Sequence, residues 1–178
     1  KNQQLKLYAY RLIEEGIHAG YPHAPLLIAT WDFVVWSNEE VRELVAGLNP
    51  ENTLLWDYIS DTYDEIHNFT NWGVTGKFPY VFGIFHAFAA STELRGNYSA
   101  IERRLPKAAD DPMCRGMIFW PENSHADTLM LEYFTANSWT PSHLEIRPFI
   151  TEFCRRRYQR KRKEMERIWQ ELLPLIQL

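Results

Sequence analysis

Hydrophobic positions along the chain follow two spacings, and together they predict an α/β fold. Four short runs are apolar at nearly every position, which is typical of strands buried on both faces. These predicted strands span residues 25–33, 52–59, 78–88 and 114–122. Elsewhere apolar residues recur every three or four positions, as on one face of an amphipathic helix. The predicted helices span residues 1–19, 37–48, 91–105 and 125–139, and helical spacing continues from about residue 142 to the end.

The order of these elements favours a parallel sheet. Strand and helix repeat along the chain, and such βα units build either a (β/α) barrel or a doubly wound sheet. No glycine-rich fingerprint follows the first predicted strand, which weighs against a dinucleotide-binding fold. We therefore predict about four of the eight strands of a (β/α)8 TIM-type barrel.

Four strands leave such a barrel open along two edges. A stable monomer does not leave strand edges exposed, because they pair readily with other chains. We therefore expect the remaining half of the barrel to come from the same parent protein or from another chain. The pattern after the last predicted strand and helix is helical throughout, so we place a domain boundary there. Residues 1–140 are assigned to the barrel and residues 141–178 to the start of an α-helical domain.

Ionisable side chains mark the ends of all four predicted strands. These residues are Asp32, Asp57, His86 and Glu122, and the first three each follow an aromatic residue. In (β/α) barrels the chemistry takes place at the C-terminal ends of the strands. A polar residue at a strand end can also cap the next helix, but a purely structural role does not require an ionisable residue at all four strand ends. We interpret the set as an active site at the mouth of the barrel.

Three segments resemble glycoside hydrolase family 89, the α-N-acetylglucosaminidases. They read NTLLWDYISDTYDE, PYVFGIFHAFAASTELRG and GMIFWPENSHADTLMLEYFTANSW, and the third is followed by ITEFCRRRYQ. Their order and spacing resemble the later half of the family's catalytic barrel over about residues 28–159. The resemblance implies the last four strands of the barrel. It also implies retaining hydrolysis of terminal α-linked N-acetylglucosamine from glycans.

The resemblance implies roles for particular side chains. Glu122 matches the Pro-Glu carboxylate that acts as nucleophile in the family, and retaining enzymes need a second carboxyl group about 5–5.5 Å away. Asp57 and His86 would bind sugar hydroxyls or the acetamido group. Tryptophans would stack on the sugar or shape the pocket, although core packing is as good a reading for Trp120. The predicted substrate-binding residues are Trp31, Asp57, Trp72, His86, Trp120 and Asn123.

Departures from the family sequence leave the substrate and the activity of the chain alone open. Residues 86–90 read HAFAA where the family has His-Asn-Phe-Gly-Gly, and Asn123 replaces a glycine. The family's acid/base glutamate lies on an earlier strand, upstream of Lys1, so we expect this chain alone to be inactive. The alternatives are a non-catalytic carbohydrate-binding module or a diverged barrel that acts on another sugar.

Composition excludes several other classes of function. The net charge is −4, no apolar stretch reaches the length of a membrane helix, and residues 1–10 do not read as a signal peptide. The basic run at residues 155–163 is followed at once by acids and an apolar helical face, so we expect no nucleic-acid partner. We expect no metal or organic cofactor either, because two carboxylates suffice for glycoside hydrolysis. Analogy with the family places the protein outside the cytoplasm.

Overall fold

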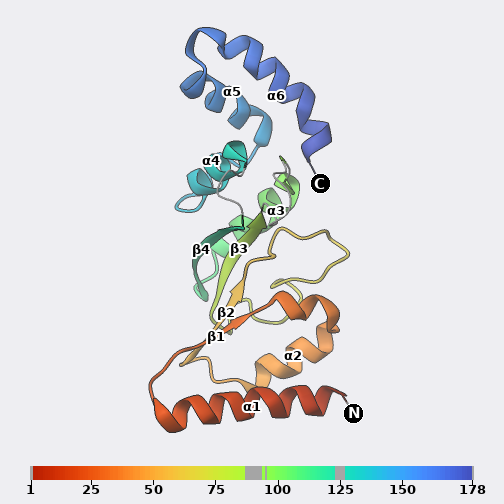
Figure 1. Cartoon of the computed structure of the whole chain (residues 1–178), viewed down its shortest axis with the longest axis vertical. Helices are drawn as coiled ribbons and strands as arrows, with labels where there is room; N and C mark the ends of the chain where they lie inside the picture. Colours follow the sequence, from red (N-terminus) through yellow and green to blue (C-terminus); the bar gives the residue numbers. More distant parts are fainter. Residues whose placement is uncertain (1, 87–93, 95, 123–126, 178) are drawn as a thin grey trace.

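The computed structural model describes residues 2–86, 94, 96–122 and 127–177 of the 178-residue chain. Its strands form one parallel sheet in which each strand pairs with the next along the chain (Figure 1). The strands are β1 (Leu26–Ala29), β2 (Thr53–Asp57), β3 (Tyr80–His86) and β4 (Cys114–Pro121). Four parallel strands with helices packed along the sheet confirm the predicted partial (β/α) barrel.

Helices lie beside this sheet and at both ends of the molecule (Figure 1). They are α1 (Asn2–Gly20), α2 (Asn38–Gly47), α3 (Tyr98–Ala109), α4 (Thr128–Asn137), α5 (Ile146–Arg157) and α6 (Arg162–Ile176), with the short 3-10 helices η1 (Trp31–Val35) and η2 (Gln159–Lys161). Figure 1 shows α1 and α2 at one end of the molecule and the paired helices α5 and α6 at the other. None of the described helices is long and apolar enough to cross a lipid bilayer.

Two predicted elements differ more than the others from the bounds that the structure gives them. The prediction of a strand over residues 25–33 is wrong beyond Ala29, because the chain turns into η1 and buries Phe33 in the core. A continuous apolar run does not distinguish a strand from such a turn. The helix predicted over residues 91–105 begins only at Tyr98, because the Asn97 side chain accepts a hydrogen bond from the Ala100 amide and caps it.

The two faces of the sheet differ in what covers them. On one face Leu55, Phe82 and Ile84 are fully buried and join a single core with side chains of α2, α3 and α4. Paired residues of neighbouring parallel strands point to the same side, and successive residues point to opposite sides. Trp56 and Phe85 therefore point to the other face, which would be the inside of a closed barrel. Both are only partly buried.

A buried carboxylate ties together the N-terminal ends of two strands, at the edge opposite to their C-terminal ends. Asp111 is 7% exposed and accepts hydrogen bonds from the Gly76 amide, the Met113 amide and the Tyr80 hydroxyl. Burial, followed by this hydrogen bond, raises the pKa of Tyr80 above its ordinary value. These hydrogen bonds fix the N-terminal ends of β3 and β4 relative to the preceding loop.

Candidate active site

Glu122 extends β4 at the C-terminal edge of the sheet. Its amide donates a hydrogen bond to the carbonyl of His86 at 3.2 Å, so the ladder between β3 and β4 continues one step past Pro121. Strand alternation places its side chain on the same face as Trp120, two residues earlier. This is the face that would be the inside of the barrel. The backbone of the predicted nucleophile is therefore held by the sheet while its side chain remains exposed.

Aromatic rings form the wall of the hollow into which Glu122 projects. The hollow has a volume of about 380 Å³, and its described lining residues are Trp31, Tyr58, Phe85, Trp120 and Glu122. Tyr58 stacks between two indoles, with centroid distances of 6.2 Å to Trp31 and 5.9 Å to Trp120. The Phe85 ring meets Trp31 edge-on at 5.3 Å. We call these five residues the aromatic pocket.

The chemistry of the aromatic pocket fits a sugar ring beside a carboxylate. Flat faces of Trp and Tyr suit the apolar C–H face of a pyranose, and a carboxylate at their edge suits attack on an adjacent carbon. Burial, then the carboxylates of Asp32, Asp57 and Glu122, raise the pKa of Tyr58, so its hydroxyl stays protonated and able to donate a hydrogen bond. The sequence prediction missed Tyr58. Its signal was strand alternation, which turns the residue after Asp57 to the pocket side.

Asp57 lies behind the aromatic pocket, on the helix-covered face. Its side chain is completely buried, and Oδ1 accepts hydrogen bonds from the Thr30 hydroxyl at 3.2 Å and the Ile59 amide at 3.1 Å. Burial raises its pKa to about 6, opposed chiefly by the hydrogen bond from Ile59. The carboxylate thus holds the turn that carries Tyr58. Direct contact between Asp57 and a sugar remains a prediction, and this placement does not support it.

His86 ends β3 and lies between the sheet and the start of α4. Its Nε2 is 3.9 Å from Oδ2 of Asp127, and both side chains are almost fully buried. Asp127 caps α4, because its Oδ1 accepts hydrogen bonds from the Leu129 and Met130 amides. Burial raises the pKa of Asp127 to about 6, and these two hydrogen bonds oppose the rise. His86 also lines a second hollow, which shares Trp31 and Phe85 with the aromatic pocket.

Trp72 lines neither the aromatic pocket nor the second hollow. Its indole is 1% exposed, packs edge-on against Phe33 and donates a hydrogen bond from Nε1 to Nδ1 of His67 at 2.6 Å. His67 in turn donates from Nε2 to the carbonyl of Trp36 at 2.6 Å. Both side chains therefore pin the long β2–β3 connection to the core. The predicted sugar contact of Trp72 gains no support from this position, and an aromatic residue in a loop gave no signal of its burial.

The structure thus brings together only part of the predicted site. Glu122, Trp31 and Trp120 share the aromatic pocket, whereas Asp57 and Trp72 are buried away from it. Asn123 lies outside the described residues, as do the positions of the altered HAFAA segment after His86. Among the described lining residues Glu122 has the single carboxylate, so the pocket offers a nucleophile or a base but no second acid.

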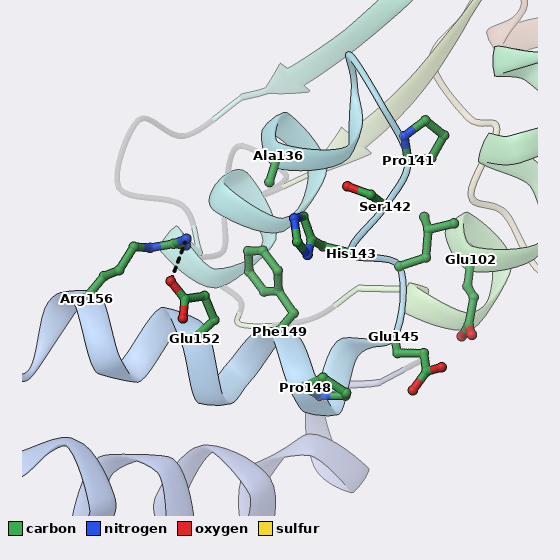
Figure 2. A pocket seen from close by; sticks show the side chains of 11 residues that line it. Glu102, Ala136, Pro141, Ser142, His143, Glu145, Pro148, Phe149, Glu152 and Arg156 are labelled. Carbon is green, nitrogen blue, oxygen red and sulfur yellow. Dashed lines mark ion pairs between the residues drawn. The ribbon is translucent and has the colours of Figure 1, made fainter.

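Two further observations bear on where the chemistry takes place. A larger hollow of about 880 Å³ lies beside α5, and its lining includes Glu102, His143, Glu145 and Phe149 (Figure 2). None of the predicted strand-end residues lines it, and its Glu152 carboxylate is already ion-paired with Arg156 at 3.6 Å. Within the described part of the chain no three His, Cys, Asp or Glu side chains are grouped so that they could hold a metal ion. The aromatic pocket therefore remains the candidate active site.

Comparison with known proteins agrees with this geometry. The sequence profile of the alpha-N-acetylglucosaminidase (NAGLU) tim-barrel domain matches residues 1–141. No curated protein sequence matches the chain significantly. A family 89 glycoside hydrolase from Clostridium perfringens in complex with PUGNAc superposes with a TM-score of 0.74 at 18% identity, over 95% of this chain and 18% of that one.

A second solved structure shows the same relation. It is a double Glu-to-Gln variant of the Clostridium perfringens enzyme in complex with its substrate GlcNAc-alpha-1,4-galactose, with a TM-score of 0.70 at 19% identity. It is covered over 18% of its length, and 93% of the present chain is aligned. The chain thus spans about a fifth of the solved relatives. It belongs to glycoside hydrolase family 89, the α-N-acetylglucosaminidase family, and contains part of that family's TIM-barrel domain.

Proposed function

We propose that this chain supplies the nucleophile half of the active site of a retaining glycosidase. Its proposed substrate is a glycan that ends in α-linked N-acetylglucosamine. The observation that carries the proposal is the position of Glu122, which projects from the C-terminal end of β4 into an aromatic pocket. Barrel chemistry takes place at this edge, and the chain is a member of a family named for this activity.

In the proposed mechanism Glu122 attacks the anomeric carbon of the terminal sugar. A carbon–oxygen bond to Glu122 forms while the bond to the leaving oxygen breaks, and a second carboxyl group protonates that oxygen. Water then attacks the same carbon and gives its proton to the second group, while the bond to Glu122 breaks and its carboxylate is restored. The sugar leaves with its original anomeric configuration. The aromatic pocket stacks on the sugar and keeps its anomeric carbon beside Glu122. The second carboxyl group comes from the remaining half of the barrel.

Uncovered apolar surface supports the proposal that another half-barrel packs here. Along α1 the exposed fractions are 65% for Leu5, 58% for Tyr8, 48% for Leu12 and 52% for Ile13, and these residues form one stripe. Leu27 on the edge strand β1 is also 50% exposed, on the face opposite to the helix-covered core. An exposed apolar stripe of this kind is typical of an interaction site. We propose that the preceding strands and helices of the barrel cover these exposed side chains. We also propose that the whole protein acts outside the cytoplasm.

A protein that carries this chain together with the remaining strands of its barrel provides the test, and we call it the whole-barrel protein. We expect it to hydrolyse an aryl α-N-acetylglucosaminide, and we expect Glu122→Gln to lower kcat roughly 10³–10⁶-fold. Glu51→Gln changes the same functional group at an exposed position remote from the pocket and serves as the matched control. Turnover that survives Glu122→Gln would overturn the nucleophile assignment.

A carbohydrate-binding module is the second candidate, because the aromatic pocket alone suffices to bind a sugar. The two candidates separate in the same experiment. A module would bind N-acetylglucosaminides without turnover, and its affinity would survive Glu122→Gln while Trp120→Ala abolished it. The aromatic side chains therefore test binding, and the carboxylate tests catalysis.

A further inference from the structure

One buried arginine holds the segment that follows β2 through hydrogen bonds. Arg104, on α3, is 5% exposed. Its Nη1 donates hydrogen bonds to the carbonyls of Ser60 and Thr62, both at 2.7 Å, and its Nη2 donates to the Asp64 carboxylate at 2.8 Å. A guanidinium presents several N–H groups in a fixed fork, so one side chain fixes three points of a loop at once. We call residues 60–64 the clamped loop.

The clamped loop is continuous with the walls of the candidate site. Tyr58, two residues before it, is part of the aromatic pocket, and Asp61 and Tyr63 line the second hollow beside His86. Ser60 attaches the loop to the sheet, because its amide donates to the carbonyl of Gly83 at 2.9 Å. A shift of the loop would therefore move the residues that face a bound sugar.

Arg103 provides an internal contrast to Arg104. Its side chain is 50% exposed, and its described hydrogen bonds run only to the Asp64 carboxylate, which is itself 68% exposed. An exposed ion pair of this kind contributes little. Arg104, in comparison, is buried and donates to two backbone carbonyls, of which that of Thr62 also accepts a longer hydrogen bond of 3.5 Å from Asn97 Nδ2. The two neighbouring arginines thus share Asp64 but differ in whether they hold the backbone.

We propose that Arg104 is a positioning residue for the side chains of this segment that line the aromatic pocket and the second hollow. It acts through the clamped loop, which keeps Tyr58, Asp61 and Tyr63 in place. Arg104 itself lines neither hollow, so it does not act by touching substrate. The proposal rests on the proposed function for its meaning in catalysis. The mechanical part, that Arg104 holds the clamped loop, stands on the contacts alone.

Kinetics of the whole-barrel protein test the effect on catalysis. Arg104→Met keeps an unbranched apolar stem in place of the guanidinium and removes all three contacts, so we expect kcat/KM to fall about 100-fold. Most of that loss should appear in KM, because Glu122 is anchored on β4 and not on the clamped loop. Arg103→Met, the matched control, should stay within about threefold of the unchanged protein. Equal kinetics for the two variants would overturn the proposal.

Hydrogen exchange of the same variants decides the mechanical part independently of any activity. We expect the amides of Ser60 and Thr62 to exchange at least about tenfold faster in Arg104→Met, and to stay unchanged in Arg103→Met. If the unchanged protein is inactive but this difference is found, the proposed function fails and the loop-holding role stands. If exchange of the clamped loop is the same in both variants, the positioning role fails whatever the activity.

A third variant covers the case in which Arg104→Met does not fold. Arg104→Lys keeps a buried cation, but a single ammonium cannot reproduce the planar fork. We expect it to fold and to show the same rise in KM and the same faster exchange, to a smaller extent. Unchanged KM and unchanged exchange of the Ser60 and Thr62 amides in Arg104→Lys would contradict the proposal.

Discussion

The same four strands carry both faces of the sheet, but the chain's own helices cover only one of them. On the helix-covered face Leu55, Phe82 and Ile84 are fully buried by the chain's own helices. On the opposite face Trp56 and Phe85 are only partly covered, and Trp120 is 43% exposed. The chain's own helices cover the first face, whereas we propose that another part of the barrel or the substrate covers the second. The difference teaches that burial, more than residue type, separates scaffold from site.

The contrast extends to the charged groups at the strand ends. Asp57 and His86 are both predicted from the sequence to bind the sugar, yet both are buried, on the helix side or against a helix terminus. Glu122 points to the open side. The ends of β2 and β4 therefore carry carboxylates of different kinds: Asp57 holds a turn on the covered face, and Glu122 is the proposed nucleophile on the open face. Substitutions that compare the two faces should separate loss of stability from loss of activity.

The largest difference in stability should come from two phenylalanines of β3. Phe82 is fully buried and packs against Phe69 and Phe134, so Phe82→Ala should destabilise the protein by about 3–5 kcal/mol. Phe85→Ala, three residues along the same strand, should cost roughly 1 kcal/mol and mainly raise KM. Urea unfolding and steady-state kinetics of the two variants measure both effects. Equal losses of stability would contradict the distinction between the faces.

Asp57→Asn should stabilise the protein near neutral pH. A pKa raised from 3.8 to about 6 means that ionisation of the buried carboxyl opposes folding, at most by about 3 kcal/mol. That cost is absent below about pH 4 and grows as the pH rises to 6, so the gain from Asp57→Asn should appear over the same interval. Asparagine retains the oxygen that accepts from Thr30 and Ile59.

Thermal unfolding between pH 3.5 and 7.5 measures this effect. Some dependence on pH should remain in Asp57→Asn, because burial also raises the pKa of Asp127 to about 6. Asp110→Asn changes an exposed carboxyl on α3's C-terminal cap and should leave the profile unchanged. A variant that is less stable than the unchanged protein at pH 7 would show that the Asp57 carboxylate stabilises the fold in its charged form.

Gly83→Ala should cost about 1–3 kcal/mol, because the strand has no room for a methyl group there. An added Cβ would lie 2.6 Å from the carbonyl oxygen of Asp57 and 2.8 Å from the Cα of Tyr58. Relief of that clash moves the turn that carries Tyr58, so KM should rise as well. Gly16→Ala on α1, where nothing lies within 4 Å, should instead gain roughly 0.5–1 kcal/mol. Unfolding midpoints of both variants check the pair.

Two tryptophans should give the smallest effects, in opposite measurements. Trp72→Phe removes the hydrogen bond to His67 and should cost about 1–2 kcal/mol of stability with no change in KM. Trp31→Phe should leave stability within about 0.5 kcal/mol and raise KM several-fold, because Trp31 is 49% exposed in the aromatic pocket. A rise in KM for Trp72→Phe would show that Trp72 contributes to substrate binding after all.

Much of the fold was readable from the sequence because its signals are local. The parallel strands were marked by runs that are apolar at nearly every position, and α2 by its helical spacing. In the structure Ser37 and Glu40 form a capping box at the start of α2. Helix spacing in the region of α5 and α6 was also clear. The turn at η1 was missed because its residues are as apolar as a strand. The assignment of residues 141–178 to a separate helical domain stays a prediction.

The site was readable only in part because its geometry depends on strand alternation and on contacts distant in sequence. The position of Glu122 followed from Pro-Glu at a strand end. Tyr58 and Phe85 were missed, since an aromatic residue in a strand reads equally well as core. Arg104 gave no signal at all: its three acceptors lie some 40 residues earlier in the chain, and only the folded structure brings them together.

The most direct test of the central claim is the identity of the residue that bonds to the sugar. The whole-barrel protein should be incubated with a fluorinated N-acetylglucosaminyl donor that forms a slowly hydrolysed intermediate, digested, and mapped by mass spectrometry. We predict one glycosyl unit on the peptide that contains Glu122, and no labelling of Glu122→Gln. A glycosyl unit on any other carboxylate would contradict the account.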